Sequence, residues 1–147
     1  MQKQWENEPD KLQFNHEGLP CIVARQPELG HLCGYVGIPE DHKYFGVDMM
    51  ETFELEVHGN ITFSSYGDDN EHLYNLFYKP DTISGKRYYW LGFDTAHSQD
   101  YVPYLYQRFP FTPGSNKEYR DIKYVVKETK SLAKQLILIY KNQTSNS

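Results

Sequence analysis

The C-terminal part of the chain constrains the fold most, because its apolar residues recur at helical spacing. They form one continuous stripe, which comprises Ile122, Val125, Val126, Thr129, Leu132, Ala133, Leu136, Ile139 and Tyr140. Such a stripe is typical of a helix that buries one face. Ser115 and Glu118, which follow Pro113 and Gly114, have the spacing of a capping box. We expect a helix of about twenty-five residues that ends near Lys141, followed by a polar tail over residues 142–147.

Short stretches with strand patterns precede this helix. We expect strands over residues 19–25, 31–38, 52–59, 61–65, 73–79 and 84–94, separated by turn-rich or polar segments. Residues 1–18 are polar and are expected to be a flexible N-terminal segment. The pattern predicts a single α+β domain over residues 19–141, with an antiparallel sheet of about four to six strands and the long helix packed on one face.

Composition excludes several classes of function. The net charge of the 147 residues is −5 and no basic run occurs, so duplex nucleic acid is not expected as a partner. No apolar run reaches the length of about 18 residues that spans a membrane. Two cysteines make no disulfide framework, and residues 1–11 lack a signal-peptide core, so we expect a cytoplasmic protein. The aromatic content of 16% suits either a sheet core or a pocket wall.

Alternation along the strands places reactive side chains on shared faces. Residues two apart on a strand point to the same side of a sheet. Three stretches thereby present an aliphatic face for the helix and a second, more polar face. If the strands are neighbours, the second faces form one wall that contains His31, Cys33, Tyr35, His58, Trp90 and Asp94. A loop of about twenty residues after Asp94, rich in tyrosine, would then close over this wall together with His97.

The residue types in this wall allow several kinds of chemistry. His31 and Cys33 could ligate zinc with Asp94 or His97, but the paired spacing of structural zinc sites is missing, so we expect no metal and no cofactor. A histidine beside Asp94 would form an oriented imidazole suited to proton transfer, although structural networks contain the same pair. Cys33 is better explained as a small buried apolar residue than as a nucleophile. His42 is expected in a solvated loop.

Ligand recognition is the remaining possibility for the same wall. Tyrosine and tryptophan rings stack on planar groups, and an arginine at a helix start can bind phosphate together with backbone N–H groups. Arg120 has that position before the expected helix. No glycine-rich phosphate loop is present, because "GYVG" and "HGN" are too short to form one.

Four motifs carry a resemblance to a known family. The stretches "GHLCGYVGIPEDH", "VHGNITF", "WLGFDTAH…D" and "YRDIKYVVKETKSLAKQL" resemble small, mostly uncharacterised proteins of tailed bacteriophages and prophages. The resemblance spans roughly residues 30 to 138. Its shared polar positions fall on His31, Cys33, Tyr35, His58, Gly59, Thr62, Asp94, His97, Asp100, Tyr119 and Arg120. This chain departs from the pattern at Asn60, where the family has glycine, and at Thr95, where it often has cysteine.

The resemblance implies a phage protein in the cytoplasm of an infected bacterial host, where many such proteins counter host defence. Our first hypothesis is that the protein binds and sequesters a small nucleotide-derived immune signal. The ligand-binding residues would then be His31, Cys33, Tyr35, Thr62, Trp90, Asp100 and Arg120, beside the His58, Asp94 and His97 groups. The second is a metal-independent phosphodiesterase-like hydrolase, with His58 and His97 as base and acid and Asp94 as the orienting carboxylate. The third is a module whose aromatic loop binds a host protein, and the apolar surface of the helix could also serve a homodimer.

Overall fold

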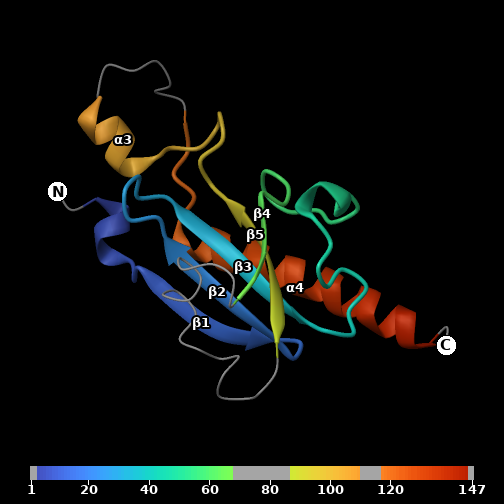
Figure 1. Ribbon diagram of the computed structural model, residues 1–147. Helices are drawn as coiled ribbons and strands as arrows, with labels where there is room; N and C mark the ends of the chain where they lie inside the picture. The colour runs from blue at the N-terminus through green and yellow to red at the C-terminus, as the bar shows by residue number, and fades with distance from the viewer. Residues whose placement is uncertain (1–2, 68–86, 110–116, 146–147) are drawn as a thin grey trace.

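The computed structural model describes residues 3–67, 87–109 and 117–145 (Figure 1). It confirms the α+β prediction, because a five-stranded antiparallel sheet is crossed on one face by a long C-terminal helix, α4. The strand order is β1-β2-β3-β5-β4. The elements are η1 (Gln4–Asn7), β1 (Lys11–His16), β2 (Leu19–Arg25), β3 (Leu32–Pro39), η2 (Met49–Glu51), β4 (Phe63–Tyr66), β5 (Tyr88–Asp94), α3 (Pro103–Arg108) and α4 (Ile122–Ser145).

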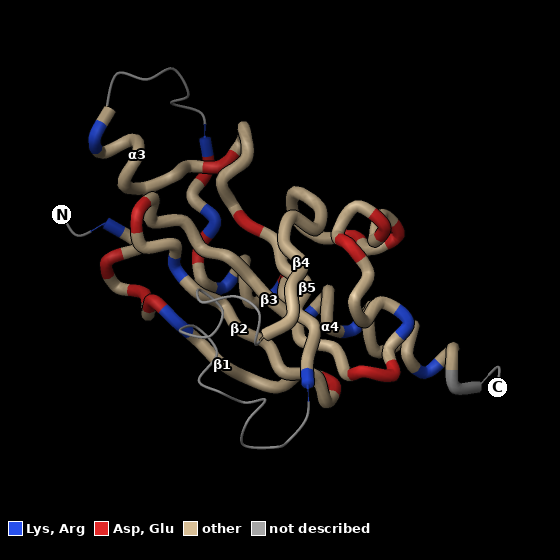
Figure 2. The backbone as a smooth tube through the Cα atoms, in the orientation of Figure 1, with Lys and Arg blue, Asp and Glu red and all other residues tan. Residues whose placement is uncertain are grey.

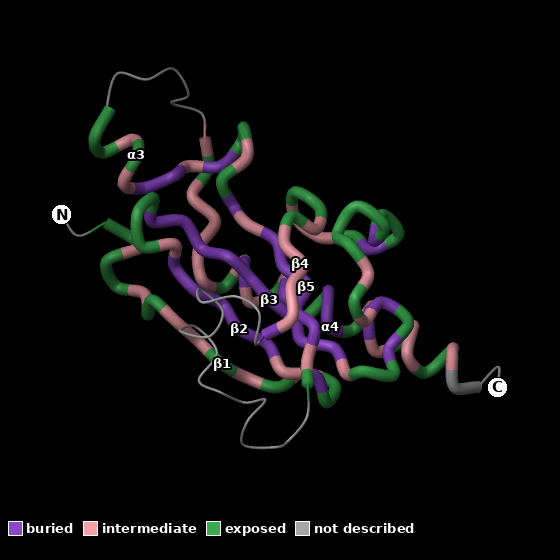
Figure 3. Tube along the Cα trace, viewed as in Figure 1, coloured by how far each residue is buried: buried purple, intermediate pink, exposed green. Residues whose placement is uncertain are grey.

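The core lies between α4 and the central strands. The predicted stripe of the helix faces the sheet, and its fully buried side chains include Val125, Leu132 and Leu136. They pack with aliphatic side chains of β2, β3 and β5, and Figure 3 colours most residues of these three strands as buried. Gly34 allows the closest approach, because a Cβ there would lie 2.3 Å from Thr129 Oγ1 on α4. The helical and strand periodicities therefore predicted correctly that the aliphatic faces of β3 and β5 pack on the helix.

The start of α4 differs from the sequence prediction. The helix begins at Ile122, and Glu118 instead forms an isolated bridge with Asp100. Asp121 is the N-cap, since its Oδ1 accepts a 2.8 Å hydrogen bond from the backbone N–H of Tyr124. A second free N–H, that of Ile122, donates to Glu8 Oε2 at 2.9 Å. The predicted capping box was wrong at Glu118, because the carboxylates of Asp121 and Glu8 accept hydrogen bonds from the first N–H groups of the helix. Ser115, the other residue of the predicted box, lies outside the described residues.

Within the described residues the N-terminal segment is part of the sheet, so the expected flexibility was wrong for residues 3–18; residues 1–2 lie outside the described part. β1 pairs with β2 from Lys11↔Ala24 to His16↔Leu19. Before it, Glu8 and Asp10 both bind the buried side chain of Arg25, at 3.2 and 2.9 Å. These contacts fix the segment through charged groups, which a hydrophobicity pattern does not reveal. At the other end, α4 continues to Ser145, so residues 142–145 are helix and not a free tail.

Residues 52–59 do not form the predicted strand. Leu55 is buried, but Phe53 is 90% exposed, so the alternation does not mark one buried face. The backbone of Glu56 finds its partners in a side chain of α4, because Gln135 donates to the Glu56 carbonyl at 2.7 Å and accepts from its N–H at 2.8 Å. Figure 2 shows several acidic residues at η2 and just after it. The predicted strand over 73–79 lies outside the described residues, and 61–65 is replaced by the short β4.

The loop expected after Asp94 contains the short helix α3. Its first residue is Pro103, which suits a helix N-terminus because no backbone N–H is lost there. The Tyr104 ring covers Gly30, where a Cβ would lie 2.9 Å from it, and the Tyr104 N–H donates to the Leu29 carbonyl. Part of the aromatic loop is thus bound to the β2–β3 connection. Within the described residues, no helix has the length and apolarity that crossing a membrane requires.

Candidate functional site

Polar side chains from three separate segments meet where β5 ends and α4 begins. We name this group the His–Asp cluster; its members are His58, Asp94, His97, Asp100, Arg120 and Tyr124. The loop before β4 supplies one histidine, the turn after β5 supplies the other, and the start of α4 supplies the arginine and the tyrosine.

Asp100 is the centre of the cluster. Its carboxylate is fully buried and accepts hydrogen bonds from Arg120 Nε at 2.8 Å, His58 Nε2 at 2.9 Å and the backbone N–H of His97 at 3.0 Å. Burial opposes its ionisation, but the hydrogen bonds from Arg120, His58 and the His97 backbone outweigh burial and lower the pKa of Asp100. Asp100 therefore joins all three segments as an ionised and internally paired group.

His58 is held at both ring nitrogens. Nε2 faces the Asp100 carboxylate, and Nδ1 lies 2.7 Å from the hydroxyl of Tyr124. The guanidinium of Arg120 stacks over the Tyr124 ring at 5.2 Å. The prediction placed His58 on a strand, but in the structure it lies in the turn before β4. Its two ring nitrogens already have partners, so proton exchange with a ligand would require one of these contacts to open.

His97 is the more accessible imidazole. Its side chain is 37% exposed, against 13% for His58, and the two ring centroids lie 6.0 Å apart. His97 Nε2 is 3.2 Å from Asp94 Oδ1 without hydrogen-bond alignment, and among the described residues this nitrogen is buried without a hydrogen-bond partner. The ring lies against Gly59, where a Cβ would be 2.1 Å from Nε2. The carboxylate and this glycine together fix one edge of the imidazole and leave the ring partly open to solvent.

Asp94 is itself positioned by two hydrogen bonds. Oδ1 accepts from the backbone N–H of Ala96 at 3.0 Å, and Oδ2 accepts from the exposed side chain of Thr62 at 3.1 Å. Asp94 is 31% exposed, so it forms the outer edge of the cluster together with Thr62 and His97. The structure thereby brings together six predicted residues: His58, Thr62, Asp94, His97, Asp100 and Arg120.

His31 is buried and interacts electrostatically with members of the cluster. It is 5% exposed, and in the described part of the chain its Nδ1 is buried without a hydrogen-bond partner. Burial lowers the pKa of His31, while the nearby carboxylates of Asp94 and Asp100 oppose this shift. His31 is therefore electrostatically coupled to the cluster as a buried, neutral imidazole.

Cys33, Tyr35 and Trp90 form a different environment. They share one face of the sheet, as predicted, but they pack with Ile22 and Ala24 in a second apolar cluster. All three are buried, and burial raises the pKa of the Cys33 thiol to about 12. The predicted continuous wall is thus two regions, one polar and one apolar, because β3 and β5 carry different residue types along their length. A reactive thiolate at Cys33 is not favoured.

The sequence analysis missed one member of the His–Asp cluster, Tyr124, and one buried histidine outside it, His42. Tyr124 lies one helical turn after Arg120, a spacing that could have identified it as a neighbour. His42 was expected in solvent, but it is 4% exposed, with Nε2 2.8 Å from the Leu136 carbonyl and Nδ1 accepting from the Tyr44 N–H at 3.0 Å.

Among the described residues, no group of three or more His, Cys, Asp or Glu side chains is arranged to hold a metal ion.

Comparisons with known proteins give no relative from which a role could be transferred. No protein-family model matches the chain, and no curated protein and no solved structure matches it significantly.

Proposed function

We propose that the His–Asp cluster binds a small nucleotide-derived ligand, with His97 as the principal contact. The observation that carries this proposal is the exposure of His97 beside groups that are otherwise internally paired. An imidazole held from one side and open on the other can donate a hydrogen bond to a phosphate oxygen or accept one from a base.

Arg120 supports a phosphate-bearing ligand. Its Nε and Nη1 bind Asp100 and Glu118, and among the described residues its Nη2 has no hydrogen-bond partner. A guanidinium fixed at two nitrogens is pre-oriented, so less conformational entropy is lost when a third nitrogen binds an oxygen. The hydroxyl of Thr62 adds a further polar group beside Asp94.

The biological setting of this proposal comes from the resemblance to phage proteins. We propose a phage accessory protein that sequesters a nucleotide-derived immune signal in the infected host. The buried positions of Cys33, Tyr35 and Trp90 favour a ligand at the polar region alone.

Hydrolysis of such a signal is the second candidate, which the two adjacent imidazole–carboxylate pairs favour. His97 with Asp94 would act as the accessible proton donor or acceptor, and His58 with Asp100 would stabilise charge from 6.0 Å away. The sequence-based hypothesis had both His58 and His97 as base and acid, whereas here only His97 has a substantially exposed ring.

One experiment separates the two candidates. The purified protein is incubated with a panel of cyclic and linear nucleotides, washed and heat-denatured, and the released material is identified by mass spectrometry. Intact nucleotide supports sequestration, and cleaved nucleotide supports hydrolysis. Neither retention nor turnover of any panel member would contradict both.

A further inference from the structure

The strand β1 forms an edge of the sheet. Among the described strands it pairs with β2 alone, at one end of the order β1-β2-β3-β5-β4. Its register runs without a bulge, and the strand contains no proline. The charged residue Lys11 lies at its first position, and the following residues up to Asn15 carry no charge. The features that usually protect an edge strand from pairing with another chain are therefore missing from most of β1.

The backbone groups that face outward from β1 follow from its hairpin. His16 directly precedes the two-residue turn, so its backbone groups face β2. The Arg25 N–H donates to the Asp10 carbonyl at 2.8 Å, which shows that Asp10 faces β2 as well. Because the direction alternates along a strand, the backbone groups of three residues point away from β2: Lys11, Gln13 and Asn15. Among the described residues, no hydrogen bond reaches these outward N–H and C=O groups.

A second copy of β1 is complementary to this edge in one register. In a two-fold dimer, if residue i faces residue j, then j also faces i. With Phe14 on the two-fold axis, Gln13 faces Asn15 of the second copy in hydrogen-bonded pairs, and Lys11 faces Glu17 of the second copy. Moving the axis to Gln13 or to Asn15 places Lys11 opposite Asn15 or Leu19, so the charges no longer match. The Phe14 register combines backbone pairing with charge complementarity.

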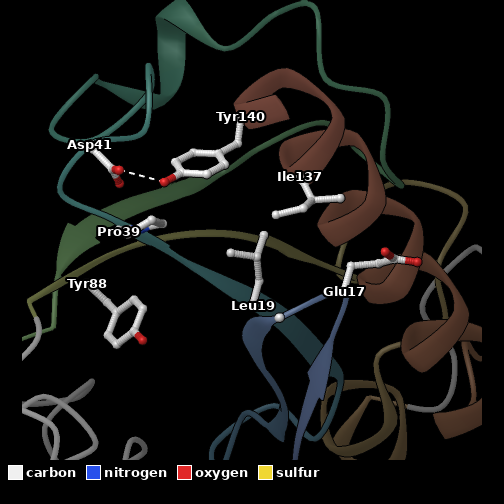
Figure 4. Close-up of a pocket in the computed structure, with 8 residues that line it drawn as sticks. Glu17, Leu19, Pro39, Asp41, Tyr88, Ile137 and Tyr140 are labelled. Atoms are coloured by element: carbon white, nitrogen blue, oxygen red, sulfur yellow. Dashed lines mark hydrogen bonds between the residues drawn. The ribbon is translucent and has the colours of Figure 1, made fainter. Parts of the chain in front are cut away.

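The side chain of Glu17 is available for such a contact. Glu17 and Gly18 form the turn between β1 and β2, with φ values of 56° and 86° that are typical of a type I′ turn. Figure 4 shows the Glu17 carboxylate pointing away from Leu19 and Ile137. Glu17 is exposed, and the described residues provide no hydrogen bond or ion pair to its carboxylate. A lysine of a second copy would therefore meet an unpaired carboxylate.

Phe14 adds apolar surface at the axis of the same register. Phe14 and Leu12 are half-buried and pack against the core. In an antiparallel pair without mutual hydrogen bonds, the Cα atoms of opposite residues lie about 4.5 Å apart. Pairing of the two strands would thus bring the Phe14 side chains of both copies together and remove more of their surface from water.

We propose that the protein forms a homodimer through antiparallel pairing of β1 with β1 of a second copy, with Phe14 on the two-fold axis. The two five-stranded sheets would form one continuous sheet, with both α4 helices on the same face. This interface is separate from the His–Asp cluster and does not depend on the function proposed for it. It also differs from the apolar surface of α4, which the sequence suggested for a dimer.

Sedimentation equilibrium of the full chain at several concentrations measures the dissociation constant of the dimer. Gln13→Pro removes an outward N–H at the centre of the interface, whereas the ladder between β1 and β2 does not use this group. We expect dimerisation to weaken roughly tenfold or more. Glu51→Lys, which reverses an exposed charge on η2, should leave the dissociation constant unchanged. Thermal melting followed by circular dichroism confirms that each variant is folded.

A charge exchange tests the register. Lys11→Glu and Glu17→Lys should each weaken dimerisation roughly fivefold, because either change places like charges opposite each other twice in the dimer. The variant that carries both changes should dimerise nearly as tightly as the unmodified protein, since opposite charges again face each other. The proposal is overturned by a protein that stays monomeric up to millimolar concentration, by a dimer that Gln13→Pro leaves intact, or by failure of the double variant to restore dimerisation.

Discussion

His58 Nε2 lies 2.9 Å from Asp100 Oδ2, a contact between residues forty-two positions apart in the chain. Asp100 is fully buried and also binds Arg120, so one carboxylate holds a turn, a strand exit and a helix start together. Stability and site geometry therefore depend on the same group.

Replacement of Asp100 by Asn is expected to destabilise the protein strongly. It leaves Arg120 without its buried counter-charge and weakens the contact to His58, and removal of one partner of a buried pair typically costs about 3–5 kcal/mol. The free energy of unfolding is measured by urea denaturation. Asp10→Asn is the matched control, because Asp10 also binds an arginine but its side chain is 82% exposed. A similar small loss in both variants would contradict the central role of Asp100.

Substitution of Gly59 by Ala tests how His97 is positioned. A Cβ at Gly59 would lie 2.1 Å from His97 Nε2, so the imidazole must leave its present position beside Asp94. Gly18→Ala is the matched control, since Gly18 also has a positive φ but a Cβ there would meet no atom within 4 Å. Both variants should lose about 1 kcal/mol of stability from backbone strain. Only Gly59→Ala should also lose nucleotide retention; equal retention by the two would show that the His97 position is unimportant.

The dependence of stability on pH should reveal the buried histidines. Burial lowers the folded-state pKa of His31 and of His42, so the unfolded chain takes up protons first as the pH falls. Their contribution is complete above the unfolded value of about 6.5 and is lost as the pH falls toward the folded pKa. Asp100, whose pKa is also lowered, adds a further loss at more acidic pH.

Urea denaturation from about pH 7.5 to about pH 5 measures this effect. Stability should decrease over the range, and His42→Gln should make the decrease shallower because one buried imidazole is removed. His16→Gln, at the end of the edge strand β1, is the comparison variant. An unchanged slope in His42→Gln would contradict the assignment of His42 as a buried neutral group.

Glu8 should contribute more to stability than its place near the N-terminus suggests. Its carboxylate binds Arg25 at 3.2 Å and accepts from Tyr119 and from the first N–H of α4. We expect Glu8→Gln to reduce the free energy of unfolding by about 1–3 kcal/mol. Glu6→Gln, an exposed carboxylate in the same segment, should change it by less than about 0.5 kcal/mol. Equal effects would show that the segment is held by its backbone alone.

Local periodicity was sufficient to predict the apolar face of α4 and the aliphatic faces of β3 and β5, because burial there follows the helical and strand repeats. Periodicity gave the wrong secondary structure where one side chain takes the place of the expected hydrogen-bond partner of the backbone. Gln135 satisfies the backbone of Glu56 and removes the need for a strand. The helix begins at Ile122 because Glu8 and Asp121 accept hydrogen bonds from its first N–H groups.

The composition of the site was predicted better than its arrangement. Asp94, His97 and Asp100 were recognised from one short motif, since they lie on the same strand exit. The internal position of His58 depends on contacts with Asp100 and Tyr124 across 42 and 66 residues, which no local pattern encodes.

The most direct test of the proposed site is a titration of ¹⁵N-histidine-labelled protein with the nucleotide panel, observed at the side-chain nitrogens. The account predicts that at least one cyclic or linear nucleotide shifts the His97 imidazole signals saturably, and that His97→Asn abolishes binding while the protein remains folded. If no panel member shifts the His97 signals, or if His97→Asn binds nucleotide as tightly as the unmodified protein, the account is contradicted.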